Sequence, residues 1–180
     1  PKLKMMGIEA VKSSTPAPCR EMIKEALKLM MEGTEEEVID YIESCRLKFK
    51  MMPPEEVSFP RTVSDVKKYK SPVTIYGKGT PIHSRGALIY NHYIKKNELD
   101  RKYSLISNGD KIKFCYLKVP NKLGENVISF ISVFPRELGI EKYVDYDLQF
   151  SKSFLEPLKI ILDSIGWSFE KTVTLESFFS

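Results

Sequence analysis

Apolar positions in the first fifty residues repeat with the spacing of two amphipathic helices. After residues 3–11, an apolar stretch typical of a buried strand, residues 13–16 offer hydroxyls for an N-cap and a proline suited to a first helical turn. Apolar side chains then recur at i, i+3 and i+4, at Cys19, Met22, Ile23, Ala26, Leu27 and Met30. The pattern stops at Gly33, so it predicts a helix with one buried face.

A second helix is predicted directly after this glycine. Thr34 and Glu37 have the spacing of a capping box. A second apolar stripe continues through Val38, Tyr41, Ile42, Cys45 and Phe49. We expect the two helices to form an antiparallel hairpin. Their Met-rich and aromatic stripe is typical of a protein core rather than of a cofactor pocket.

Prolines and turn residues divide the middle of the chain. Pro53 and Pro54 end the hairpin, a short extended piece follows at Val57 and Phe59, and Ser64 is a candidate cap for one helical turn through Tyr69. A basic, turn-rich stretch at 70–81 then precedes a helix that the spacing predicts over 82–96. The inward-facing residues of that helix are expected to be Ile82, Ala87, Leu88 and Ile94.

The remaining pattern predicts two strands and a last helix. Asn108-Gly109 is typical of a turn. Apolar and basic residues partly alternate over 111–119, which predicts a strand with one solvent-exposed face. A second strand is predicted at 127–133, after a loop that contains Gly124. A long helix is predicted at 144–165, with Trp167 covering its apolar side. The predicted class is therefore α+β: a helix-rich domain with a helical hairpin, a small central antiparallel sheet and a long C-terminal helix.

Composition narrows the kind of protein. At 180 residues with 42% hydrophobic and 29% charged positions, the chain suits one globular core with an appendage. No apolar run reaches the roughly 20 residues of a membrane helix, and the first residues lack the pattern of a secretion signal. Three widely spaced cysteines favour a reducing cytoplasm over a disulfide framework. A strand-like pattern that begins at Pro1 indicates a piece of a longer protein.

The charge is concentrated in the middle of the chain. The net charge is +4, but residues 61–122 carry 14 Lys and Arg residues against 4 acids, whereas residues 123–180 carry 5 against 9. Such a surplus is typical of a protein that binds a polyanion such as nucleic acid. A solvated lysine-rich surface remains an alternative. A membrane surface is disfavoured, because the basic residues do not lie on one long amphipathic helix.

No self-sufficient active site is visible in the sequence. Asp145 and Asp147 resemble paired metal-holding aspartates, but they open a predicted helix, where acids complement the dipole. The two histidines, His83 and His92, have no zinc-ligand spacing. We therefore expect neither a catalytic residue nor a metal site.

Two segments are more informative. The sequence 83–86 (HSRG) follows a basic turn and opens a helix, so its side chains and N–H groups are candidates for one phosphate contact, against the alternative of an ordinary helix start. The C-terminal tail places Leu175, Phe178 and Phe179 on a polar background, which is typical of a peptide that enters a partner's pocket. Folding back on the core is the alternative for this tail.

Taken in order, these segments resemble family B DNA polymerases of T-even-like bacteriophages, from the end of the palm through the thumb. The matching segments run across nearly the whole chain: 1–9 (PKLKMMGIE), 12–16 (KSSTP), 81–91 (PIHSRGALIYN), 109–111 (GDK), 152–158 (KSFLEPL) and 175–179 (LESFF). The resemblance implies the end of a palm strand at 1–14, a thumb domain at 15–170 and a sliding-clamp-binding tail at 171–180. The sequence departs from the family's pattern at two positions. The basic residue that precedes the segment 83–86 is Lys78, which is one position away from its place in the family. Glu156 stands where relatives carry Lys.

The resemblance also implies a function. A thumb holds the primer-template duplex through its phosphates, and the candidate contacts are Lys4, Lys12, His83, Arg85, Lys111 and Lys118. Leu175, Phe178 and Phe179 would dock into the sliding clamp. In the family, the catalytic aspartates that hold Mg²⁺ belong to a part of the polymerase upstream of Pro1. The fingers and the exonuclease also lie upstream. This chain alone is therefore expected to need no cofactor and to be inactive.

The implied partners are DNA, the N-terminal portion of the polymerase and the clamp, in the host cytoplasm. The chain would be an isolated thumb or the smaller half of a split enzyme. The alternative function is a stand-alone accessory protein that bridges nucleic acid to a protein partner.

Overall fold

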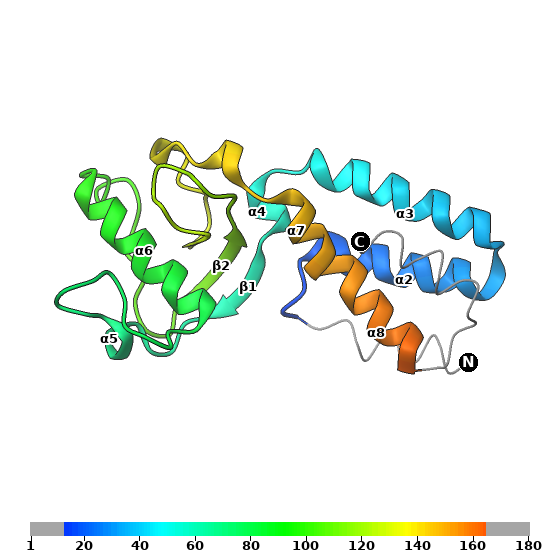
Figure 1. Cartoon of the computed structure of the whole chain (residues 1–180), viewed down its shortest axis with the longest axis horizontal. Coiled ribbons are helices and arrows are strands. Elements are labelled where there is room, and N and C mark those ends of the chain that lie inside the picture. The colour runs from blue at the N-terminus through cyan, green and yellow to red at the C-terminus, as the bar shows by residue number, and fades with distance from the viewer. Residues whose placement is uncertain (1–12, 165–180) are drawn as a thin grey trace. The chain divides into compact units, whose positions relative to one another are not determined.

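The computed structural model describes residues 13–164 and divides the chain into two compact units (Figure 1). The described part of the helical unit is residues 13–57 and 146–164, and the sheet unit is residues 58–145. The chain therefore leaves the helical unit, builds the sheet unit and returns. The predicted strand at 3–11 and Trp167 lie outside the described residues.

The helical unit begins with the predicted hairpin. Helix α2 (Ala17–Glu32) and helix α3 (Glu35–Lys50) run antiparallel beside each other (Figure 1). All six apolar positions predicted for α2 are buried, and so are four of the five predicted for α3; Tyr41 is partly buried. Gly33 ends α2, and the Thr34 hydroxyl accepts a hydrogen bond of 3.2 Å from the Glu37 N–H. The hairpin and its boundary are confirmed.

Two predicted helix caps are wrong. No side chain caps α2; its N-cap is Pro16, with φ −54° and ψ 137°, and a further proline occupies its first turn. Proline presets the helix entry, so a hydroxyl cap is not needed there. Ser64 does not cap helix α5 (Val66–Tyr69) either. The Val66 N–H donates instead to the Asn108 side-chain oxygen at 2.7 Å, a partner 42 residues away that a local pattern cannot show.

The linker and the last helix also differ from prediction. Val57 is not extended but ends one helical turn, α4 (Pro54–Val57). Its carbonyl accepts a hydrogen bond from the buried Gln149 amide at 2.7 Å, a contact with the last helix that the local pattern does not show. The C-terminal helix begins two residues later than predicted and contains a π-helical segment: α7 (Tyr146–Phe150), η3 (Ser151–Leu155) and α8 (Glu156–Ser164). Val144 belongs instead to a bridge with Leu117 in the sheet unit.

Aromatic side chains join the last helix to the hairpin. The ring of Phe150 lies 5.3 Å from that of Phe49 and 5.1 Å from that of Phe154, centroid to centroid. The Tyr146 hydroxyl donates to the Met52 carbonyl at 2.6 Å. One hydrophobic cluster therefore contains both halves of this unit, although the sheet unit of residues 58–145 separates them in sequence.

The sheet unit contains three antiparallel strands in the order β1 (Phe59–Thr62), β2 (Lys111–Tyr116) and β3 (Val127–Phe130). Phe59 pairs with Phe114, which in turn pairs with Ser129. Helix α6 (Ile82–Lys96) has the predicted bounds and packs on β3; Ala87, Leu88 and Ile94 are buried, while Ile82 is only partly so. Two 3-10 turns, η1 (Arg136–Leu138) and η2 (Glu141–Tyr143), complete the unit. The α+β class with a small antiparallel sheet is confirmed.

Candidate nucleic-acid interface

The first turn of α6 is held tightly against β3. A Cβ on Gly86 would lie 2.4 Å from the Ser129 hydroxyl oxygen and 2.9 Å from the Ser129 backbone nitrogen, so a side chain does not fit there. The Ser129 hydroxyl donates to the His83 carbonyl at 2.9 Å, and Ser84 is buried. Half of the predicted phosphate motif therefore serves packing. Its remaining side chains, His83 and Arg85, are partly exposed.

Arg85 is oriented by an acid and a tyrosine. Its guanidinium lies 3.4 Å from a Glu125 carboxylate oxygen, and the Tyr76 hydroxyl donates to that same oxygen at 3.1 Å. The guanidinium carbon also lies 5.6 Å from the centre of the Tyr76 ring. The side chains of Arg85 and Glu125 are 20% and 17% exposed. Because a guanidinium has five N–H donors and Glu125 takes one, Arg85 keeps donors for a phosphate.

Arg61 is a second half-buried guanidinium, which the sequence analysis missed. It lies on β1, with its guanidinium carbon 5.3 Å from the centre of the Phe114 ring and 5.6 Å from that of Phe59, and it donates to the Pro60 carbonyl at 2.8 Å. Burial lowers its pKa, yet a guanidinium stays charged at neutral pH. A single Arg in a short extended segment is not part of any sequence motif that would identify it as a site residue. The pairing of β1 with β2 is what places it beside Phe114.

His83 approaches the same aromatic group. The centre of its ring lies 6.5 Å from the centre of the Phe114 ring. Burial and, second, the positive charge of Arg61 lower the pKa of His83 below its usual value. His83 is therefore mainly neutral at pH 7 and offers a hydrogen bond rather than a charge to a ligand.

The structure does not gather the predicted DNA contacts at one point. Lys111 is exposed at the start of β2 and Lys118 is exposed two residues beyond its end, about 23 Å apart if the chain between them is extended. Strand alternation puts Lys111 on the face opposite Phe114, and therefore opposite His83. The described candidates thus suit separate phosphates. Lys4, Lys12, Leu175, Phe178 and Phe179 lie outside the described residues.

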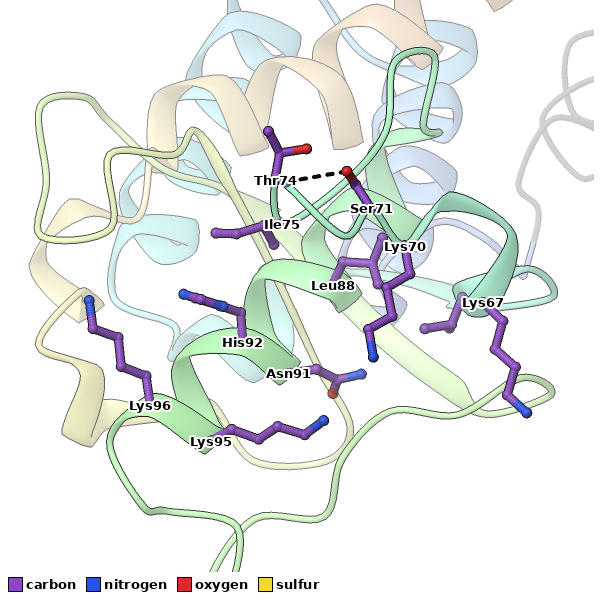
Figure 2. Close-up of a pocket in the computed structure, with 11 residues that line it drawn as sticks. Lys67, Lys70, Ser71, Thr74, Ile75, Leu88, Asn91, His92, Lys95 and Lys96 are labelled. Carbon is purple, nitrogen blue, oxygen red and sulfur yellow. Dashed lines mark hydrogen bonds between the residues drawn. The ribbon is translucent and has the colours of Figure 1, made fainter.

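A second basic site, absent from the sequence analysis, lies along α6 (Figure 2). This lysine pocket encloses about 480 Å³. It is lined by Val66, Lys67, Lys70, Ser71, Thr74, Ile75, Leu88, Asn91, His92, Lys95 and Lys96. The basic dipeptides at 67–68 and 95–96 are visible in the sequence, but nothing in the sequence shows that they share a pocket.

The aspartate pair forms no metal centre with its neighbours. Asp147 lies in the first turn of α7, and its carboxylate is 3.3 Å from the Lys50 ammonium. The Asp145 N–H donates to the Tyr116 carbonyl at 2.9 Å. Among residues 13–164 no three His, Cys, Asp or Glu side chains come together as metal ligands. In the same residues, every helix is too short or too polar to span a membrane.

The chain is similar to known phage proteins along nearly its whole length. No protein-family model matches the chain. It is 27% identical over 183 residues to the DNA-directed DNA polymerase of Enterobacteria phage T4, and 27% identical over 185 residues to that of Escherichia phage RB69. Each alignment includes 99% of this chain and 20% of the relative.

The chain thus spans about a fifth of the length of these curated relatives. An α+β chain with its basic residues concentrated in one unit is similar, from end to end, to one segment of larger proteins. Those proteins are phage DNA-directed DNA polymerases, and the resemblance predicted from the motifs is confirmed.

Proposed function

We propose that this chain is the thumb region of a phage replicative DNA polymerase and that it holds primer-template duplex by its phosphates. The observation that carries the proposal is the similarity to two phage DNA polymerases across 99% of the chain. The chain corresponds to 20% of either relative, and its motifs resemble the end of the palm and the thumb, so nucleotidyl transfer and its metal ions would belong to the rest of such an enzyme. The contribution of this chain is to bind and position DNA.

The side chains of the sheet unit suit contacts that do not read sequence. Arg85 is oriented by Glu125, Arg61 lies against aromatic rings, and lysines stand at the start of β2 and two residues beyond its end. Charged donors on a rigid sheet and helix neutralise phosphates and set the register of a duplex, whatever its bases. Binding of this kind weakens steeply with salt, because each neutralised phosphate releases condensed counterions.

The test is duplex binding by the whole chain, measured by fluorescence anisotropy at salt concentrations between about 50 and 200 mM. A strand variant, Lys111→Gln with Lys118→Gln, should reduce the slope of log affinity against log salt by about 1.8, since each phosphate contact contributes about 0.9. The matched control is a hairpin variant, Lys28→Gln with Lys48→Gln, which removes the same charge from exposed positions of α2 and α3. The proposal is contradicted if the duplex affinity does not change with salt concentration, or if the strand variant and the hairpin variant lose the same amount of duplex affinity.

The tail is proposed to dock into the sliding clamp. One helical turn would present Leu175, Phe178 and Phe179 to a single apolar pocket while Glu176 stays in water. A peptide of residues 171–180 should bind the cognate clamp, and Phe178→Ala with Phe179→Ala should cost about 2 kcal/mol or more of binding free energy. Glu176→Ala is the control and should change little. Equal binding by all three peptides contradicts this role.

A further inference from the structure

The lysine pocket combines an apolar floor with a cationic rim. Its apolar lining residues are Val66, Leu88 and Ile75, of which Val66 and Leu88 are buried. In Figure 2, the side chains of Lys70 and Lys95 extend towards the space beside Asn91. The pocket thus offers an apolar surface and two convergent ammonium groups.

Two of the uncharged polar side chains that line the pocket, Asn91 and Ser71, already form hydrogen bonds within the chain. The Asn91 amide donates to the Ile106 carbonyl at 2.9 Å and accepts from the Ile106 N–H at 2.8 Å. The Ser71 hydroxyl accepts from the Thr74 N–H at 3.2 Å, which holds the loop in a turn (Figure 2). A ligand would therefore be recognised mainly by the cations and the apolar floor.

Several of these cations have no counter-charge. Within residues 13–164, neither Lys67, Lys70 nor Lys95 forms an ion pair, and no acid lines the pocket. The helix dipole accounts for Lys95 and Lys96 in the last turn of α6, but not for Lys70, which follows α5 and faces the same space. The arrangement is that of a site for an anion with an apolar part.

We infer that the lysine pocket binds one unpaired nucleotide of a nucleic-acid strand, with the phosphates on either side of it on Lys70 and Lys95 and its base on the apolar floor at Leu88. The inference rests on the proposed function, since the strand would be the unpaired part of a primer-template. A paired base stays stacked in the duplex, so a pocket that takes a base selects single strands. A volume of about 480 Å³ lies within the usual range of small-ligand sites.

The pocket is separate from the duplex contacts. Arg85 and Lys95 lie ten residues apart on α6, about 15 Å along the helix axis. Both ends of one rigid helix can therefore hold one DNA molecule, its duplex at the first turn and its single strand at the last.

The experiment compares two DNA probes on the whole chain by fluorescence anisotropy: a fluorescent octamer of deoxythymidylate and a duplex. The pocket variant is Lys70→Gln with Lys95→Gln, both exposed, so folding should be retained. It should bind the octamer about tenfold less tightly and lower the salt slope by about 1.4, while its duplex affinity stays within about twofold of the unmodified chain. The strand variant should show the opposite pattern.

Control variants distinguish binding in the lysine pocket from general electrostatic attraction between DNA and a basic protein. An equal loss of octamer binding in the hairpin variant, or an equal loss of duplex binding in the pocket variant, overturns the inference. An abasic octamer of the same charge should bind more weakly than the deoxythymidylate octamer. Equal binding of the two octamers would show that the pocket does not hold a base. If the chain binds the octamer through Lys70 and Lys95 but does not bind duplex at all, the thumb proposal is wrong. The inference that the lysine pocket binds single-stranded DNA would then still be supported.

Discussion

Gly86 lets α6 approach β3 more closely than a residue with a side chain would. A methyl group there would lie 2.9 Å from the Ser129 backbone nitrogen, which cannot move without shifting the strand. We expect Gly86→Ala to lower the free energy of unfolding by about 1–3 kcal/mol, as overpacking does. Urea or thermal unfolding measures this loss.

The matched control is Gly77→Ala, in the loop before α6. Its nearest atom to an added Cβ is the Tyr69 carbonyl oxygen at 3.4 Å, an ordinary contact. That variant should stay within about 0.5 kcal/mol of the unmodified chain. Equal stability of the two variants would show that α6 can move away from β3 at little cost.

His83 makes the stability of the sheet unit depend on pH. Burial and Arg61 lower the pKa of His83 in the folded chain, so the unfolded chain binds its proton more readily. Stability should therefore fall as the pH drops from the unfolded value of about 6.5 to the lowered folded value, and should be insensitive to this group above that window. His83→Gln should reduce the slope of unfolding free energy against pH there. An unchanged slope would contradict the burial of this imidazole.

At the scale of elements, the hairpin helices begin in different ways. Helix α3 uses the Thr34 hydroxyl as its cap, whereas α2 begins at Pro16 without a side-chain cap. Thr34→Ala should cost about 1 kcal/mol of unfolding free energy, and Thr34→Ser should retain most of it, because serine keeps the hydroxyl. Ser13→Ala, before α2, should change little. A loss at Ser13 as large as that at Thr34 would mean that a hydroxyl does stabilise the start of α2.

At the scale of the whole molecule, the chain alone should not extend a primer. Phosphoryl transfer needs carboxylates that hold metal ions, and the motif resemblance puts those of the polymerase in the N-terminal portion, since this chain corresponds to 20% of the relatives' length. With Mg²⁺, nucleotides and primed template, we expect extension only when the N-terminal portion of the polymerase is added. The measurement is a gel-based extension assay. Extension by this chain alone that is lost with Asp145→Asn or Asp147→Asn would contradict the assignment of these residues to helix-start and backbone contacts.

The division into two units is also a property of the whole molecule. The resemblance implies one thumb domain at 15–170, and the described residues of that range form two compact units, with boundaries between residues 57 and 58 and between residues 145 and 146. The basic surplus of residues 61–122 falls within the sheet unit, and so does the lysine pocket. DNA-binding variants should therefore be made in this unit and controls in the helical one.

The sequence by itself determined the elements whose causes are local. The apolar stripes of α2 and α3, the stop at Gly33, the cap at Thr34 and the bounds of α6 all follow from residues within a few positions of one another. Helical periodicity and capping act over one or two turns, so a local pattern is enough to predict them. The ordered motifs also determined the resemblance to phage polymerases.

Only the tertiary structure decided how distant residues meet. Arg85 and Glu125 are 40 residues apart, Asn108 caps a helix 42 residues earlier, and Gln149 bonds to Val57 across 92 residues. The lysine pocket likewise joins a loop to the last turn of α6. Such contacts depend on strand pairing and on which faces pack together, and these are decided by burial over the whole unit. A local pattern shows the residue types available for a site, but packing determines which of them share it.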